Sequence, residues 1–266
     1  MTQMIFDPFE NAYDEVPLTN APVVRAICQV QFPPIIKVSE RLFIADFQDA
    51  IRSFYPIFIE DVSQVMTMLP TGAKLESLPV WRFFDVTQAW RVSLTQNFLT
   101  IETTTYKSRH DFLDKVGFVL GRASETIKPS HALRIGIRYI NHLEHAPDEK
   151  PSNLLREDLC ATYGSIKSGP TNYMMSEVFL ATDVGSLRSK WGFLPPNSTH
   201  DVENMQPKAA PSSFLDIDAF VDHSTMTVEF EPHVIVAGAE KLSAACYNFF
   251  RWRVNDTLIE SKRASL

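Results

Sequence analysis

Cysteine is scarce in this sequence, and the few cysteines lie far apart. Of 266 residues only three are cysteine, at positions 28, 160 and 246. An odd number of cysteines without close spacing excludes the disulfide framework that is typical of small secreted domains. The composition therefore favours a reducing compartment, and we expect a cytoplasmic protein.

Long apolar runs are also missing. A membrane-spanning helix needs about 20 mostly apolar residues in a row, and the sequence offers no such stretch. The first 17 residues have neither a basic start nor an apolar segment, so they lack the pattern of a secretory signal. We expect no membrane association, and we interpret residues 1–17 as an acidic N-terminal arm.

A surplus of positive charge is a third absence. The chain has 25 Lys and Arg against 32 Asp and Glu, which gives a formal net charge of -7. Non-specific binding to nucleic acid requires a basic surface that neutralises phosphates. The charge balance therefore argues against nucleic acid as a partner.

The common enzyme fingerprints are absent as well. The sequence has no phosphate-binding loop, no dinucleotide-binding glycine motif, no nucleophile elbow, and no H-E-x-x-H or C-x-x-C pair. No cluster of four zinc ligands can be recognised either. We predict no cofactor and no structural zinc.

What the sequence does have is the patterning of a folded α+β protein. Apolar residues make up 45% of the chain, and they recur with the periods of strands and helices. The first half predicts the order strand, helix, four strands, helix. Strands are expected at 23–32, 57–68, 80–86, 90–95 and 98–106, and helices at 42–55 and 109–128, with Ser39 and Ser108 as N-caps.

The same order returns in the second half. Strands are expected at 131–142, 173–182, 186–193, 214–222 and 225–230, and helices at 153–163 and 237–258. We therefore predict two pseudo-repeated β-α-β4-α halves, residues 18–129 and 130–266, that form one curved antiparallel sheet with the helices on one face. The polar, proline-rich stretch 195–212 interrupts the second half as an insertion loop.

Several strings carry a resemblance to a known family. They are Pro17-Leu18-x-Asn20-Ala21-Pro22-Val23-Val24, Trp90-x-Val92-x-Leu94, Arg134-Ile135-Gly136-Ile137-Arg138-Tyr139-Ile140-Asn141 and Leu215-Asp216-Ile217-Asp218. Through them nearly the whole chain resembles the sporadically distributed family of bacterial and archaeal proteins of about this length and of unknown function. The resemblance implies a stand-alone prokaryotic protein and no assigned activity. The repeated order of elements also resembles, in topology only, the saddle of TATA-box-binding proteins.

Strand alternation predicts one apolar and one charged face of the sheet. Arg134 and Arg138 share a face of one strand, and Asp216 and Asp218 share a face of another. The candidate ligand-binding residues of the charged face are Arg134, Arg138, Arg188, Asp216, Asp218, Glu229 and Glu231. Because arginine pairs bidentately with carboxylate or phosphate, we expect Arg134 and Arg138 to anchor an anionic ligand. The alternative is that aspartates of a neighbouring strand hold these arginines in structural ion pairs.

Two functions stay open on this basis. The first is a non-enzymatic binding or interaction protein that recognises an unknown protein or a small anionic ligand with the charged face and the 195–212 loop. The alternative is a metal-dependent enzyme that acts on a phosphorylated or nucleotide ligand, with Asp216, Asp218, Glu229 and Glu231 as oxygen ligands for Mg²⁺. We expect the binding protein. Phe250 on the last helix is a candidate subunit contact, which leaves a homodimer open.

Overall fold

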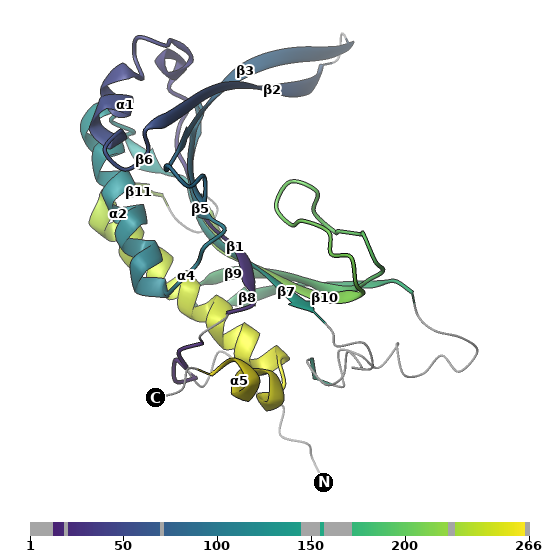
Figure 1. Cartoon of the computed structure of the whole chain (residues 1–266). Coiled ribbons are helices and arrows are strands. Elements are labelled where there is room, and N and C mark those ends of the chain that lie inside the picture. Colours follow the sequence, from purple (N-terminus) through teal and green to yellow (C-terminus); the bar gives the residue numbers. More distant parts are fainter. Residues whose placement is uncertain are drawn as a thin grey trace.

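A computed structural model describes residues 13–18, 21–69, 72–144, 155–156, 172–222 and 227–263. In these ranges the chain is a mixed α+β protein with one nine-stranded antiparallel sheet, one two-stranded sheet and four α-helices (Figure 1). The predicted α+β class with a large antiparallel sheet is therefore confirmed.

The first half contains a strand, a short helix, four strands and a long helix. They are β1 (Val23–Gln31), a 3-10 helix η1 (Ile36–Ser39), α1 (Ala45–Ile51), β2 (Ile57–Leu69), β3 (Gly72–Phe84), β4 (Trp90–Leu94), β5 (Phe98–Thr103) and α2 (Arg109–Thr126). The N-cap of α2 is Ser108, whose hydroxyl accepts a hydrogen bond of 3.1 Å from the backbone N–H of Asp111. This cap satisfies an N–H that has no partner inside the helix, and it was predicted from the sequence.

The second half contains fewer strands of the large sheet. Its elements are β6 (His131–Ala132), β7 (Arg134–Glu144), β8 (Met174–Thr182), β9 (Gly185–Leu194), β10 (Ser212–Asp222), β11 (Val228–Glu229), α4 (Pro232–Arg253) and α5 (Asp256–Lys262). Apart from Leu155 and Arg156, the helix predicted at 153–163 lies outside the described residues.

The strands β1 and β7, one from each half, lie side by side at the centre of the large sheet. The strand order is β2-β3-β4-β5-β1-β7-β10-β9-β8, and all neighbouring strands are antiparallel. Outward from β1 the order is β5, β4, β3 and β2, and outward from β7 it is β10, β9 and β8. Because the nine strands form one continuous sheet, side chains that point to the same side of neighbouring strands share one face of that sheet.

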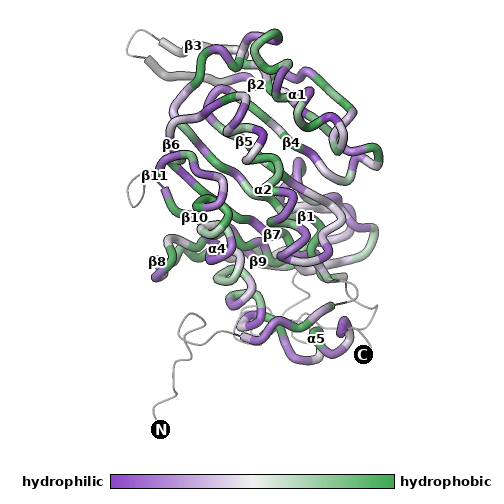
Figure 2. Tube along the Cα trace, turned by 90° about the vertical axis from the view of Figure 1, so that its left-hand side faces the viewer, coloured by the Kyte–Doolittle hydropathy of each residue, from purple (hydrophilic) through white to green (hydrophobic). Residues whose placement is uncertain are grey.

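The helices of the described residues lie on one face of this sheet. In Figure 1, α1, α2 and α4 lie on the left, and the sheet curves away from them so that its other face is concave. Figure 2 looks onto the helical side, where α2 and α4 cross in front of the central strands. Within the described residues, no helix combines the length and the apolar character needed to cross a bilayer.

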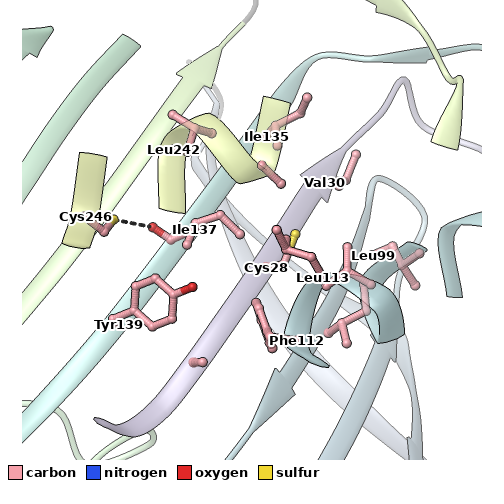
Figure 3. Packing of buried hydrophobic residues seen from close by; sticks show 14 of the residues in the cluster. Cys28, Val30, Leu99, Phe112, Leu113, Ile135, Ile137, Tyr139, Leu242 and Cys246 are labelled. Atoms are coloured by element: carbon pink, nitrogen blue, oxygen red, sulfur yellow. Dashed lines mark hydrogen bonds between the residues drawn. The ribbon is translucent and has the colours of Figure 1, made fainter. Parts of the chain in front are cut away.

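The main hydrophobic core fills the space between the helices and the sheet. Figure 3 shows Cys28 of β1, Ile137 of β7, Phe112 of α2 and Leu242 of α4 packed together. The Cys246 thiol of α4 donates a hydrogen bond to the carbonyl oxygen of Ile137 over 3.6 Å. Burial raises the pKa of the Cys28 thiol to about 12, so this cysteine is neutral filling of the core rather than a nucleophile.

Two predicted elements of the first half are wrong in extent. The helix predicted at 42–55 is confined to α1, and Phe54, counted on its apolar side, lies beyond α1 and is 61% exposed. Ser39 ends η1 instead of capping α1. The strand predicted at 80–86 begins at Gly72, because β3 pairs with β2 along its full length, from Gly72 opposite Leu69 to Phe84 opposite Ile57.

The strand predicted at 225–230 is also wrong. Among its described residues, 227–230, only Val228 and Glu229 form a strand, and they pair with β6 in the separate two-stranded sheet. The next residues turn into α4, which begins at Pro232, since proline at the first helical position needs no N–H partner. The helix predicted at 237–258 therefore starts earlier, and it is divided at Val254, which is in extended conformation before α5.

Candidate functional site

The concave face of the sheet carries a polar groove with a volume of about 770 Å³. Its floor consists of side chains that alternate along β3, β4, β5, β1, β7 and β10. Figure 1 shows the face of these strands that lies opposite the helices. The charged residues among its lining are Arg82, Arg91, Glu102, Arg134, Arg138, Glu203 and Asp218. This groove is large enough for a small-molecule ligand.

At the first-half end of the groove, two arginines share one carboxylate. Glu102 of β5 is 4% exposed, and its Oε1 atom lies 2.7 Å from an Nη atom of Arg91 on β4. The same oxygen forms an ion pair with Arg25 of β1. Arg25 also donates from Nε to the carbonyl oxygen of Asn204 over 3.0 Å. One negative charge therefore faces two positive charges across three neighbouring strands.

A third arginine lies next to this group. Arg82 of β3 pairs with Asp61 of β2 at 3.0 Å. In the described part of the chain, the Nε atoms of both Arg82 and Arg91 are buried and make no hydrogen bond. The hydroxyl and amide side chains that line this end are Gln29, Ser63, Ser93, Thr95, Gln96, Asn97 and Thr100. The first-half end is thus rich in hydrogen-bond donors and carries a local excess of positive charge.

At the second-half end, one arginine holds two carboxylates. Arg138 of β7 donates from Nε and Nη to the two oxygens of Asp216 over 2.8 and 2.6 Å, and from Nη to Asp201 over 2.7 Å. Burial disfavours the charged form of Asp216, yet the hydrogen bonds from Arg138 and His200 outweigh it and lower the pKa of that carboxyl below its ordinary value. The predicted pairing of arginines with aspartates across neighbouring strands is therefore found here.

Arg134 is held in a different way. Its guanidinium lies 4.6 Å from the centre of the Phe220 ring and donates to Asp218 over 3.2 Å. It also lies back over Gly136, where an added Cβ atom would overlap an Nη atom of Arg134, so the glycine makes room for this arrangement. Burial raises the pKa of Asp218, which is the opposite of the shift at Asp216.

The insertion between β9 and β10, residues 195–211, folds over the second-half end. Its Met205 is 1% exposed and packs with Ile140, Leu194 and Phe214 in a small cluster on the concave side. The ring of His200 stacks on Phe214 at 4.0 Å, and its Nε2 lies 3.0 Å from an oxygen of Asp216. The predicted loop is therefore anchored by one apolar cluster and by the ion pairs of Arg138.

The other predicted site residues are not brought together with this group. Arg188 of β9 stands opposite Asp218, but its own ion pair is with Glu177 of β8. Glu229 lies in the two-stranded sheet, and Glu231 is the N-cap of α4 beside His233. Neither glutamate lines the groove, so the predicted quartet of oxygen ligands is not assembled. Across the described ranges, no three His, Cys, Asp or Glu side chains are grouped closely enough to hold a metal ion.

Phe250, the candidate subunit contact, is buried as well. Its side chain is 7% exposed and belongs to the main core. It therefore offers no apolar surface for a second copy of the chain, and the reason given for a homodimer is removed.

Sequence reasoning missed the first-half end of the groove. Alternation alone places Arg25, Arg91 and Glu102 on the polar faces of three separate strands. Their meeting depends on the register, in which Glu102 is directly opposite Arg91 and Ile27. It also missed the contacts of His200 and Asp201, because nothing in a polar loop sequence indicates where the loop folds back.

The site and fold define a class: a mixed α+β protein with a charged groove on the concave face of a curved antiparallel sheet. No protein-family model and no curated protein matches this chain. The function is therefore inferred from the geometry of the groove.

Proposed function

We propose that this protein is a binding protein that holds a small hydrophilic anion at the first-half end of its concave groove. The observation that carries the proposal is the excess of guanidinium groups there, with Arg25 and Arg91 on the single carboxylate of Glu102. An anion between Arg82 and Arg91 would accept hydrogen bonds from the exposed part of their guanidinium groups, since the two side chains are 32% and 24% exposed. Such bonds are short and strong because the donors are charged.

The neighbouring side chains support a hydrophilic ligand. Ser93 and Thr100 line the groove beside the arginines, and Gln29 joins them from β1. Hydroxyl and amide groups can donate to and accept from a ligand that carries hydroxyls of its own. The ligand class is therefore a compound with a phosphate or carboxylate group and a polar body. Its recognition requires no metal.

The sequence resemblance belongs to this proposal too. We infer a prokaryotic, cytoplasmic protein of the sporadically distributed family, built from two related halves with a saddle topology like that of TATA-box-binding proteins. The order of strands outward from β1 and from β7 supports the repeat, since β5, β4 and β3 then correspond to β10, β9 and β8. The buried, unpaired Cys28 and Cys246 are in keeping with a reducing compartment.

Calorimetric titration tests the proposed anion site. Pyrophosphate serves as the phosphate probe and citrate as the carboxylate probe, each added to the wild type, to Arg91→Gln and to Arg122→Gln. Arg122 on α2 pairs with Glu125 on the helical side, so its variant is the matched control for loss of one arginine. We expect saturable binding of at least one probe, weakened about tenfold or more by Arg91→Gln and unchanged by Arg122→Gln. A tenfold loss of affinity corresponds to about 1.4 kcal/mol of binding free energy.

Absence of saturable binding of both probes would reject the anion site. Equal affinities of the wild type and Arg91→Gln would place the anion elsewhere. The phosphate and carboxylate arms together decide which of the two groups the groove prefers.

A further inference from the structure

A second cavity lies on the opposite, helical side of the sheet. It has a volume of about 390 Å³ and is lined by residues of β7 and β10, of α4, of the start of α2 and of the N-terminal segment. Among its lining are Pro17, Tyr106, Tyr139, Cys246 and Phe250. Its residues on β7 and β10, Tyr139 and Ile217, alternate with the groove residues Arg138 and Asp218, so the sheet separates the two cavities.

The N-terminal strap, which we define as residues 13–18, forms one wall of this cavity. The backbone N–H of Val16 donates to the hydroxyl of Tyr247 over 2.8 Å, and that hydroxyl donates to the carbonyl oxygen of Asp14 over 3.1 Å. Leu18 forms an isolated β-bridge with Arg263. The strap is thus held against α4 and the chain after α5 by a small number of polar contacts (Figure 1).

The interior of the cavity offers an apolar surface. Val23, Ile217 and Phe250 line it, and the polar groups of Tyr139, Ser243 and Asn141 beside them are already hydrogen-bonded. The Tyr139 hydroxyl lies 2.7 Å from the hydroxyl of Ser243, and Asn141 donates to the carbonyl oxygen of Leu215 over 3.0 Å. Burial raises the pKa of Tyr106 to about 12, so this phenol is neutral. A group that enters the cavity therefore meets hydrocarbon and satisfied dipoles, which favours an apolar occupant.

The rim of the cavity is positively charged. Lys107 and Arg109 line it at the start of α2, where the helix dipole adds a partial positive charge. Lys107 is exposed and has no acidic partner within ion-pair distance in the described part of the chain. Arg109 is paired at 2.6 Å with Glu15 of the strap, whose side chain is 58% exposed. The chain's own carboxylate therefore already occupies one anion position at this rim.

We propose that the cavity binds a small hydrophobic monocarboxylate, with its hydrocarbon body among Val23, Ile217 and Phe250 and its carboxylate at Lys107 and Arg109. The carboxylate takes the place of Glu15 on the Arg109 guanidinium, and the strap closes over the hydrocarbon body. A neutral molecule of the same length fills the interior but leaves Glu15 on Arg109. This site is independent of the anion in the groove, which is hydrophilic and lies across the sheet.

Octanoate and 1-octanol are the matched probes for this site, titrated into the full chain by calorimetry. We expect octanoate to bind saturably and at least tenfold more tightly than 1-octanol. Arg109→Gln should weaken octanoate about tenfold and leave 1-octanol unchanged. Glu15→Gln should tighten octanoate several-fold, because it removes the competing carboxylate. The control Arg122→Gln, on the same helix but outside the cavity, should change neither.

Three outcomes would overturn the proposal. They are no saturable binding of octanoate by the wild type, equal affinity for octanoate and 1-octanol, and an effect of Arg91→Gln as large as that of Arg109→Gln. The last would place octanoate in the groove. If Arg109→Gln unfolds, Glu15→Gln decides the matter, since an unchanged octanoate affinity in that variant contradicts the displacement of Glu15.

Discussion

The two ends of the concave groove use the same residue types in opposite proportions. At the first-half end, Arg25 and Arg91 share the carboxylate of Glu102. At the second-half end, Asp216 and Asp201 share the guanidinium of Arg138. The difference shows that a row of charges on one sheet face can serve two purposes. An excess of arginine leaves donors for a ligand, whereas an excess of aspartate engages the Nε atom and one Nη atom of Arg138 to fasten a loop.

The connection to the loop 195–211 explains why the second-half end is a structural element, since Glu102 at the other end is as deeply buried as Asp216. Asp216 is 4% exposed, and a buried carboxylate is costly unless it is paired and hydrogen-bonded. Arg138 and His200 supply those partners, one from the sheet and one from the loop 195–211. We therefore assign Arg138 to the fold, and we assign anion binding to Arg82 and Arg91.

The largest effect that separates the two ends is expected from Arg138→Met. The variant leaves Asp216 and Asp201 without their guanidinium, and breaking a buried pair costs about 3 kcal/mol in the free energy of unfolding. Arg91→Met should cost about 1 kcal/mol, because Arg25 still pairs with Glu102. Urea unfolding of both variants gives the two values. Equal losses would remove the contrast between the ends.

The loop itself provides the next test. Met205 is its buried anchor beside Ile140 and Phe214. Met205→Ala should therefore lower the free energy that holds the loop closed by about 2 kcal/mol, near the lower end for such truncations. Hydrogen exchange should become faster at residues 195–211 and stay unchanged at β4 and β5. Slow exchange throughout the loop in this variant would mean that the ion pairs of Arg138 hold it alone.

A smaller effect is expected when a carboxylate is removed from the first-half end. Glu102→Gln should tighten pyrophosphate about fivefold, or about 1 kcal/mol, because Arg25 and Arg91 are then left to the ligand. Glu177→Gln is the matched control, since Glu177 pairs with Arg188 at the far edge of the sheet. Weaker pyrophosphate binding by Glu102→Gln would show that Glu102 positions the arginines rather than competing for them.

The smallest effect concerns Asp218. A carboxyl whose pKa is raised by folding destabilises the folded state above that pKa, and the cost disappears as the pH falls and the group becomes protonated. Asp218→Asn should therefore gain about 0.5 kcal/mol at pH 7, part of the gain being offset by the lost ion pair with Arg134. Thermal unfolding from pH 7 down to pH 4 should show the gain shrinking. A gain that grows toward low pH would have the wrong sign.

Sequence periodicity predicts the elements of this protein better than their lengths. The strands at 23–32, 90–95 and 214–222 agree with β1, β4 and β10 to within a few residues, because apolar and polar residues largely alternate in their sequences. The first part of β3 contains Gly72 and Pro79, which weaken a strand signal, and only its pairing with β2 makes it extended. Tertiary pairing thus decides what local pattern leaves open.

The candidate site was predictable only in part. Alternation indicates that Arg134, Arg138, Asp216 and Asp218 share a face, and the structure brings these four together. Which arginine is occupied and which is available depends on strand register and on the path of the 195–211 loop. Neither of these is encoded in a local pattern. The same limit explains why Glu229 and Glu231, predicted on this face, lie outside the groove.

Anomalous diffraction from a crystal containing selenate tests the assignment of the two ends most directly, because it locates a phosphate-like anion without any substitution. We predict an anomalous peak in the groove between the guanidinium groups of Arg82 and Arg91. A peak at Arg134 and Arg138, or a groove without selenate in a crystal that binds it elsewhere, would contradict the assignment.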